Sequence, residues 1–346
     1  MQKLIGIVVL GILLGTAQLA SAGQPEEAMA AVKRGDFAAA LNIWRPLADQ
    51  GDASAQANLG IMYANGEGVA QDYGQAMAWY RKAAEQGSST AQNNLGAMYH
   101  SGQGVARDDG QAIAWYRKAA EQGYASAQLN LGIMYANGQG IARDEKEAAA
   151  WYQKAADQGN AKAQASLGAM YAAGSGVAKD KEKALEWFRK AAEQGNPDAQ
   201  YNLGVIYEYG HGIAADNEAA IRWYRAAADQ GHLYAQYNLA VNYANGTGVA
   251  QDFREAAKWF REAAGQGDAA AQSNLGAMYA NGQGVEQDLV RAHMWLSLAA
   301  DSSDNAENKD ASQRRDTVVQ QMTSAQVESA KEKAEQCRQS NFRQCD

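Results

Sequence analysis

The sequence predicts an all-α fold, an α/α superhelical solenoid of about seven 36-residue helical hairpins with N- and C-terminal caps. Three residue types recur every 36 positions along most of the chain. The tryptophan column consists of Trp79, Trp115, Trp151, Trp187, Trp223, Trp259 and Trp295. A leucine column from Leu59 to Leu275 and a tyrosine column from Tyr63 to Tyr279 keep the same step. A constant period of this length indicates stacked repeats, so we expect one quasi-linear array rather than several globular domains.

The first half of each repeat is predicted to be an amphipathic helix. In the first copy Ala55, Leu59 and Tyr63 follow one another at four-residue steps, which places them on one apolar stripe. Gly66 and Gly68 then break the pattern, and glycine is the residue that tolerates positive φ. A turn is therefore expected after each first helix.

The second half of each repeat is predicted to be another helix with its own start and stop signals. Asp72 stands at the start, and Gln75 three residues later would complete a capping box. Trp79 belongs to the buried stripe, and Gly87 is expected to end the helix in the left-handed conformation. Gly60 on the first helix is expected to let the two helices pack closely.

Both ends of the array are predicted to be capped. Residues 23–52 should form an N-terminal capping hairpin, and the seven repeats should span residues 53–300. Residues 301–346 should form a C-terminal helical cap with two charged helices, near residues 311–322 and 325–336. Caps are needed because a terminal repeat has one face without a neighbour.

Residues 1–22 are predicted to be a secretory signal peptide. Lys3 supplies a positive charge, an apolar run spans residues 4–14, and Ala20-Ser21-Ala22 matches a cleavage site. An uncleaved membrane anchor is the alternative, but the run is short for a membrane span and lacks a cationic flank. We expect cleavage after Ala22 and a bacterial periplasmic or secreted protein, not inserted in a membrane.

Cys337 and Cys345 are the only cysteines, and an even pair outside the cytoplasm predicts one disulfide that clips the tail. On a continuous helix they would be about 12 Å apart, so the chain must turn between them, near Ser340 and Asn341. Two free thiols or an intermolecular bond are the alternatives.

The repeat consensus resembles a known family. In the first copy it comprises Ala55, Leu59-Gly60, Met62-Tyr63, Gly66, Gly68-Val69, Asp72, Ala76, Trp79-Tyr80, Lys82-Ala83-Ala84 and Gln86-Gly87. This pattern resembles the Sel-like repeat family, α/α solenoids related to tetratricopeptide repeats. The resemblance implies a right-handed superhelix that serves as an adaptor or receptor for proteins and peptides.

The composition and motifs argue against several other functions. A net charge of -8 disfavours nucleic acid and anionic membranes, which need a basic face. The four histidines, His100, His211, His232 and His293, occupy unrelated repeat positions, so no metal site is expected. Neither Ser-x-x-Lys nor Gly-x-Ser-x-Gly occurs. We therefore expect no catalytic residues and no cofactor.

An asparagine column is the first candidate binding feature. Six of seven repeats carry it, with Ser166 as the exception, and its members are Asn58, Asn94, Asn130, Asn202, Asn238 and Asn274. Asparagine is unfavourable inside a helix, so its recurrence needs a cause. One hypothesis is a ladder of amides that hydrogen-bonds an extended peptide, and the alternative is a bond to the neighbouring repeat.

Extra tyrosines in repeats five and six are the second candidate feature. Tyr201, Tyr209, Tyr234 and Tyr237 lie outside the packing columns, on or beside the stripe expected to face the concave groove. Tyrosine is enriched in binding hot spots. Aromatic packing between repeats is the alternative.

The sequence thus predicts an extracytoplasmic adaptor, expected to be a monomer, that binds a protein or peptide partner in its concave groove. Two alternatives remain open from the resemblance. One is a cell-envelope enzyme acting on β-lactams or peptidoglycan, as described for some cysteine-rich relatives. The other is a secreted virulence factor that binds a host protein such as immunoglobulin.

Overall fold

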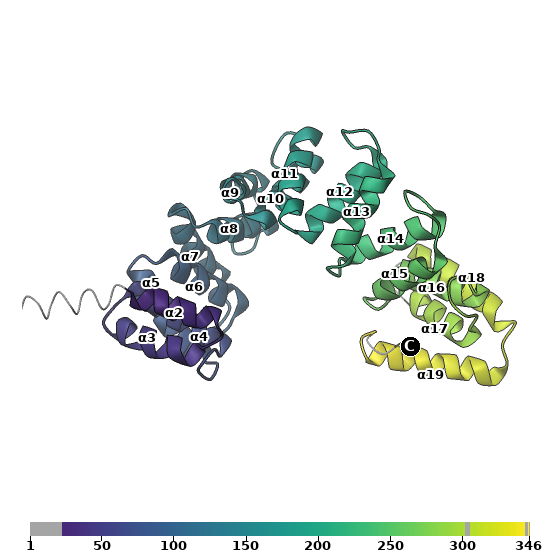
Figure 1. The fold of residues 1–346 in the computed structure, drawn as a ribbon, viewed down its shortest axis with the longest axis horizontal. Coiled ribbons are helices and arrows are strands. Elements are labelled where there is room, and N and C mark those ends of the chain that lie inside the picture. Colours follow the sequence, from purple (N-terminus) through teal and green to yellow (C-terminus); the bar gives the residue numbers. More distant parts are fainter. Residues whose placement is uncertain (1–22, 302–304, 343–344, 346) are drawn as a thin grey trace, which may run out of the picture. The chain divides into compact units, whose positions relative to one another are not determined.

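The computed structural model describes residues 23–301, 305–342 and 345, and every regular element in these ranges is a helix (Figure 1). The seven first helices are α4 (Ala53–Asn65), α6 (Ser89–Ser101), α8 (Ala125–Asn137), α10 (Ala161–Ala173), α12 (Pro197–Tyr209), α14 (Leu233–Asn245) and α16 (Ala269–Asn281). The seven second helices are α5 (Tyr73–Glu85), α7 (Asp109–Glu121), α9 (Glu145–Asp157), α11 (Lys181–Glu193), α13 (Asn217–Ala228), α15 (Phe253–Ala264) and α17 (Leu289–Ala300). The predicted α/α solenoid of seven hairpins is confirmed. The predicted signal peptide, residues 1–22, lies outside the described residues.

The chain divides into two compact units. The first runs to Ala163 and includes residues 175–177, and the second holds residues 164–174 and the chain from Ala178 onward. Hairpins α4/α5, α6/α7 and α8/α9 belong to the first unit. Hairpins α12/α13, α14/α15 and α16/α17 belong to the second. The four candidate tyrosines therefore all lie in the second unit.

Aspartate caps the second helices, but not through the expected capping box. The Asp72 carboxylate accepts a hydrogen bond from the Gln75 backbone N–H at 3.0 Å, as predicted. The reciprocal bond is not needed, because the Asp72 backbone N–H already donates to the Tyr63 carbonyl at 2.9 Å. This backbone bond recurs in the following repeats and ties each second helix to the end of its first helix.

Two glycines per repeat have structural tasks that the sequence predicted. Gly87 adopts φ of 94°, and the next backbone N–H donates to the Ala83 carbonyl at 3.0 Å, which closes the helix end. Gly60 faces the Tyr80 ring so closely that a Cβ there would lie 2.4 Å from a ring carbon. Close packing of the two helices in a hairpin therefore depends on the absent side chain.

The close contact between glycine and the tyrosine ring, which recurs in other repeats, predicts that a methyl group added at the glycine lowers the stability of the fold. A Cβ at Gly204 would lie 2.4 Å from the buried Tyr224 ring, so Gly204→Ala should lower the free energy of unfolding by about 1–3 kcal/mol. Gly74→Ala is the matched control, because repeats three to five carry Lys146, Glu182 and Glu218 at that exposed position. The control should instead be neutral or slightly stabilising. Urea denaturation of both variants checks this, and equal losses would contradict it.

A ladder of buried glutamines links successive helices, and sequence analysis missed it. Gln92 is 5% exposed; its amide donates to the Ala84 carbonyl at 3.1 Å and its carbonyl oxygen accepts from Gln122 at 2.7 Å. The same pair of bonds is found around Gln56, Gln128, Gln200 and Gln236. Each of these five first helices is thereby fixed to the second helix before it and to the one after it.

Arginine adds a second recurring link to the tyrosine column. Arg117 donates to the Tyr135 hydroxyl at 3.1 Å, and Arg189 to Tyr207 at 3.1 Å. Both arginines lie 18 residues before their tyrosines, on the preceding second helix. The tyrosine column therefore makes directed contacts in addition to packing.

The N-terminal cap consists of α2 (Gln24–Lys33) and α3 (Phe37–Asp49). Trp44 is 4% exposed and shares a core with Ala55, Leu59 and Met62 of the first repeat. Phe37 packs beside this core, and its backbone leaves no room for a side chain at Gly68. The hairpin thus packs on the first repeat, and its role as a cap stays a prediction.

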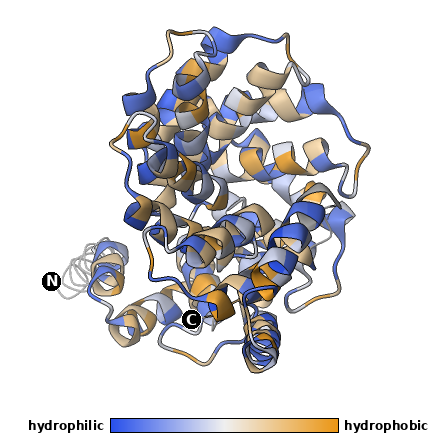
Figure 2. Ribbon diagram, turned by 90° about the vertical axis from the view of Figure 1, so that its right-hand side faces the viewer, coloured by the Kyte–Doolittle hydropathy of each residue, from blue (hydrophilic) through white to orange (hydrophobic). Residues whose placement is uncertain are grey.

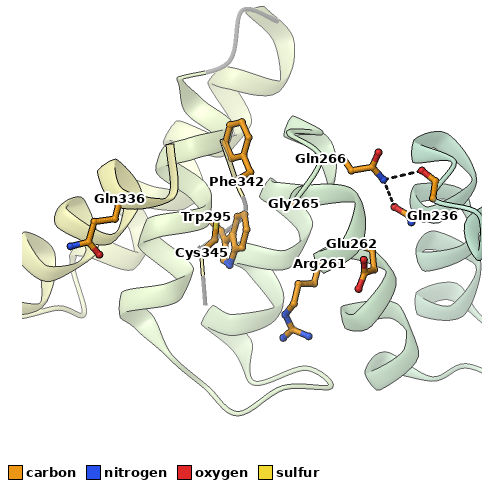
Figure 3. A pocket seen from close by; sticks show the side chains of 10 residues that line it. Gln236, Arg261, Glu262, Gly265, Gln266, Trp295, Gln336, Phe342 and Cys345 are labelled. Carbon is orange, nitrogen blue, oxygen red and sulfur yellow. Dashed lines mark hydrogen bonds between the residues drawn. The ribbon is translucent and has the colours of Figure 1, made fainter. Parts of the chain in front are cut away.

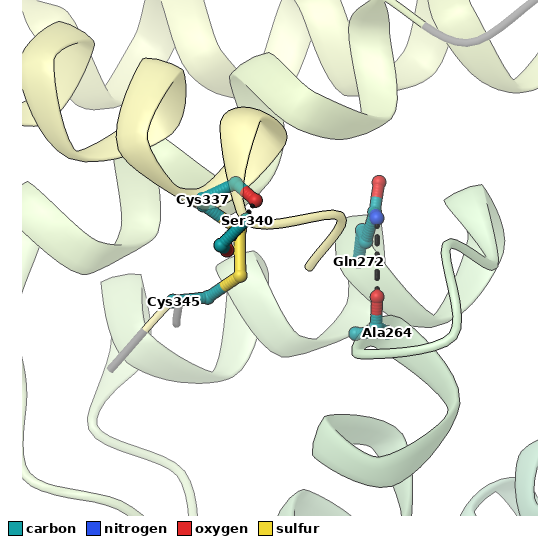
Figure 4. Close-up of a disulfide and its surroundings, with 5 residues drawn as sticks. All are labelled: Ala264, Gln272, Cys337, Ser340 and Cys345. Carbon is teal, nitrogen blue, oxygen red and sulfur yellow. Dashed lines mark hydrogen bonds between the residues drawn. A yellow bond between two sulfur atoms is a disulfide. The ribbon is translucent and has the colours of Figure 1, made fainter. Parts of the chain in front are cut away.

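The C-terminal cap consists of α18 (Asn305–Val319) and α19 (Ser324–Gln339), and α18 starts earlier than predicted. Cys337 and Cys345 form a disulfide, with Cα atoms 4.5 Å apart (Figure 4). The chain turns at Asn341 and Phe342, both with positive φ, which is where the sequence required a turn. The turn places the Phe342 ring against Gly267 at the end of α15.

Apolar and polar residues interleave along individual helices, as expected for hairpins that bury one stripe each (Figure 2). Within the ranges that the structure describes, no helix has the length and apolar character needed to cross a membrane.

Candidate functional site

Two of the four candidate tyrosines, Tyr201 and Tyr234, lie near the N-terminus of α14. The Tyr201 ring from α12 stacks on the His232 ring with centroids 4.7 Å apart, and Tyr234 lies 6.0 Å from Tyr201. Tyr209, two turns further along α12, stacks on His211 at 5.9 Å. We call Tyr201, Tyr209, Tyr234, His211 and His232 the aromatic patch.

The members of the aromatic patch differ in exposure. Tyr209 is 65% exposed and Tyr234 is 58% exposed, and Met29 is the other large apolar side chain with such exposure among the described residues. Tyr201 is half-buried and packs on the core through Tyr224. Exposed tyrosine supplies rigid contact area at little entropic cost, so Tyr209 and Tyr234 are the better candidates for partner contact.

The fourth tyrosine, Tyr237, lies apart from the aromatic patch. It occupies the repeat position of Tyr201 one repeat later and packs edge-on against Phe260, with centroids 5.8 Å apart. Tyr237 is half-buried against the core of the second unit. Both Tyr201 and Tyr237 therefore contribute to packing, and truncating either would also cost stability.

Burial shifts the pKa of two members of the aromatic patch, His232 and Tyr201. Burial lowers the pKa of the His232 imidazole, which outweighs the opposite effect of the Asp198 carboxylate 3.5 Å away. Burial also raises the pKa of the Tyr201 hydroxyl. At neutral pH the His232 and Tyr201 rings are therefore uncharged, and His232 accepts the backbone N–H of Ala235 as the N-cap of α14.

The asparagine column is half-buried, and its members have different partners. Asn130 donates to the Asn93 side chain of the preceding repeat at 3.0 Å. Asn94 hydrogen-bonds Tyr80, whose pKa is nevertheless raised to about 12 by burial. Asn202 donates to the Asp198 carbonyl of its own helix at 2.7 Å. Several of these amides thus stabilise the repeats, and peptide binding by the column stays a prediction.

Two column members line cavities that occupy equivalent places in the second unit. The cavity at Asn202, of about 330 Å³, is also lined by Phe188, Val205 and Ile206. The cavity at Asn274, of about 380 Å³, is lined by the residues 72 positions later, Phe260, Ala277 and Met278. The repeat geometry therefore creates a recurring hollow beside the asparagine column.

One repeat after the Asn202 cavity, a hydrogen-bonded network of polar side chains occupies the equivalent position. Glu208 accepts hydrogen bonds from the Tyr224 hydroxyl at 2.6 Å and from the Asn242 amide at 3.3 Å. Burial and the neighbouring Glu208 carboxylate raise the pKa of Tyr224. Asn242 stands where other repeats carry methionine or isoleucine, so this network is specific to repeats five and six.

The sequence and the solved structures identify the family. The Sel1 repeat model matches residues 53–88, 89–124, 125–160, 161–196, 197–232, 233–268 and 269–304. The chain belongs to the Sel1 repeat family. A Sel1 repeat protein from Oxalobacter formigenes is 37% identical, covers 83% of this chain and 89% of its own, and has a TM-score of 0.65.

Two further solved structures match over different lengths. A protective antigen from uropathogenic Escherichia coli is 31% identical over 96% of both chains, with a TM-score of 0.35. Helicobacter pylori cysteine rich protein B is 28% identical over 37% of this chain and 92% of its own, with a TM-score of 0.32. A search of curated proteins found no match. Sel1 repeat proteins are generally scaffolds that bind other proteins.

A large cavity lies where the last Sel1 repeats meet the tail (Figure 3). It measures about 950 Å³, and Phe342 and Cys345 of the tail form part of its wall. On the opposite wall Gln266 donates to Gln236 at 2.7 Å, a bond of the glutamine ladder. The glutamine ladder and the disulfide-linked tail therefore both contribute to its lining.

One serine–histidine pair occurs in the last Sel1 repeat. The Ser297 hydroxyl lies 3.3 Å from Nδ1 of His293, one turn apart on α17. His293 is 3% exposed, and burial together with Arg315 and Lys331 lowers its pKa. Within the ranges that the structure describes, no group of three His, Cys, Asp or Glu residues could hold a metal ion.

Of the nine residues that line the Asn202 cavity, the sequence indicated only Asn202 as a binding residue; Lys179, Lys181 and His211 are among the eight that it did not indicate. A signal for Lys181 was present. Repeats two and three carry Asp109 and Glu145 at its position, so the charge changes sign in repeat four.

Proposed function

We propose that this Sel1 repeat protein is an extracytoplasmic adaptor that binds a protein or peptide partner on the first helices of repeats five and six. The observation that carries the proposal is the exposure of Tyr209 and Tyr234 beside the stacked Tyr201 and His232. Aromatic side chains grouped on a rigid helical scaffold are typical of binding hot spots. The Asn202 cavity adjoins the patch through His211, which lines the cavity and stacks on Tyr209.

Two observations support a location outside the cytoplasm. The first 22 residues have the charge, apolar run and cleavage motif of a secretory signal. The Cys337–Cys345 disulfide is of the kind that persists in oxidising compartments. Both features fit the bacterial periplasm or the exterior.

Site-specific crosslinking tests the adaptor function. A photo-crosslinking residue at Tyr234 should capture a discrete partner in cells, which mass spectrometry identifies. Lys162 is the matched control, because it is exposed and lies at the same position two repeats earlier. Equal capture from both positions, or none from Tyr234, would contradict the proposal.

The captured partner then allows a quantitative prediction. Tyr209→Ala combined with Tyr234→Ala should weaken partner binding by roughly 10–100-fold, as expected for paired hot-spot residues. The melting temperature should change little, since both side chains are mostly exposed. Calorimetry on the purified variant and partner measures the first effect, and a thermal scan measures the second.

A further inference from the structure

We propose that the Asn202 cavity is an anchor site for a peptide segment in which one apolar side chain is flanked by carboxylates. The inference rests on the proposed adaptor function and names the chemistry of the partner. It is drawn from the apolar floor of the cavity, from the two lysines at its rim and from the side-chain oxygen of Asn202.

The floor of the cavity is apolar and well ordered by packing. Phe188 is 2% exposed, Ala184 is 2% exposed and Ile206 is 8% exposed, and all three line the cavity. Val205 completes the wall from α12. A volume of about 330 Å³ is at the lower end of known ligand pockets, and it suits one branched or aromatic side chain rather than a large ligand.

The rim of the cavity carries two lysines without an internal counter-ion. Lys179 and Lys181 are exposed, and neither makes an ion pair with any residue in the ranges that the structure describes. Two acids neighbour these lysines in the sequence, Asp180 and Glu182. The Asp180 carboxylate is engaged, because it caps α11 and lies 3.7 Å from Lys183, and the exposed Glu182 forms no ion pair with either rim lysine among the described residues. In a chain of net charge -8, this rim is a local cationic site.

The equivalent places in repeats two and three show what the rim lacks. There Arg107 pairs with Asp109 at 2.7 Å, and Arg143 pairs with Glu145. Repeat four keeps the first cation as Lys179 but replaces the carboxylate with Lys181. A carboxylate supplied by a partner would stand where the other repeats provide their own.

Two more groups can fix the backbone of such a segment. The Asn202 amide nitrogen already donates to the Asp198 carbonyl at 2.7 Å, which leaves the side-chain oxygen to accept a peptide N–H. His211 lines the same cavity and stacks on Tyr209. A peptide anchored in the cavity would therefore continue onto the aromatic patch.

The test is a binding series with the full chain and a short fluorescent peptide, Ser-Glu-Leu-Glu-Ser, blocked at both ends. Fluorescence polarisation should show that replacing leucine by alanine weakens binding roughly tenfold, the scale of one lost apolar side chain. Replacing both glutamates by glutamine should also weaken binding, and added salt should reduce the difference between the two peptides.

The decisive variant is Lys181→Glu, which restores the arrangement of repeats two and three. It should form an internal ion pair with Lys179, keep the melting temperature within a few degrees and weaken the acidic peptide roughly tenfold. Lys146→Glu makes the same charge change at an exposed position of repeat three and should leave binding unchanged.

Two outcomes would overturn the inference. One is equal binding of the acidic and glutamine peptides, which would show that carboxylates are not recognised. The other is equal binding by wild type and Lys181→Glu, which would place the site elsewhere. If the partner crosslinked from Tyr234 is still captured in either case, the adaptor function stands and only the anchor is wrong.

Discussion

Raising the pH from about 10 to about 12 is expected to destabilise the repeats by roughly 3–5 kcal/mol through two buried tyrosines alone. Burial raises the pKa of both Tyr80 and Tyr116 to about 12, from 10.0 in an exposed side chain. The unfolded chain therefore loses these protons first as the pH rises. The stabilisation is complete below pH 10 and is lost progressively toward pH 12.

The repeats themselves supply the control for this alkaline transition. Phe188 and Phe260 occupy the same column as Tyr116 and are equally buried, so phenylalanine fits the site. Tyr116→Phe should match wild type in urea denaturation at neutral pH and be more stable than wild type at about pH 11. If the variant loses as much stability as wild type between these pH values, deprotonation of Tyr116 is not part of the transition.

Gln236→Leu is expected to lower the free energy of unfolding by about 1–3 kcal/mol, although it adds apolar surface to a buried position. The Gln236 amide donates to the Ala228 carbonyl at 3.2 Å, and its oxygen accepts from Gln266 at 2.7 Å. Leucine would leave the Ala228 carbonyl and the Gln266 amide without these partners. The Ala228 carbonyl would still accept the Gly231 N–H, and the Gln266 amide would still donate to the Gly231 carbonyl, so the expected cost is that of two lost hydrogen bonds.

Gln320→Leu is the control for this substitution, because Gln320 is exposed on the turn after α18. The control should change the urea midpoint very little. A comparable loss in both variants would mean that the effect comes from added surface hydrophobicity rather than from the ladder. Hydrogen exchange should also show faster opening around α14 and α15 in Gln236→Leu.

Much of the fold could be predicted because apolar periodicity and helix caps are local. The spacing of Leu59 and Tyr63 gives the first helix, and Asp72 and Gly87 mark the limits of the second. The glutamine ladder could not be found in this way. Gln56 looks like a surface residue by hydropathy, and its partner, the Ala48 carbonyl, is eight residues back across a turn. Only the geometry of that turn shows that the amide is buried.

The candidate site was predictable in part. Repeats five and six were identified because their tyrosines depart from the consensus, but the sequence could not rank those tyrosines by exposure. Tyr201 and Tyr209 lie two turns apart on α12, and only the neighbouring α13 and α14 decide that the first is half-buried and the second exposed. The Asn202 cavity likewise depends on three helices meeting, which no local pattern records.

The glutamine ladder also limits how a chain of this kind can change in length. Its bonds join residues eight apart and thirty apart, so an insertion inside a hairpin would move donors away from their acceptors. Duplication or loss of a complete 36-residue unit keeps both separations intact. We therefore expect such a protein to gain or lose complete hairpins during evolution. Insertion of part of a hairpin would break the glutamine ladder.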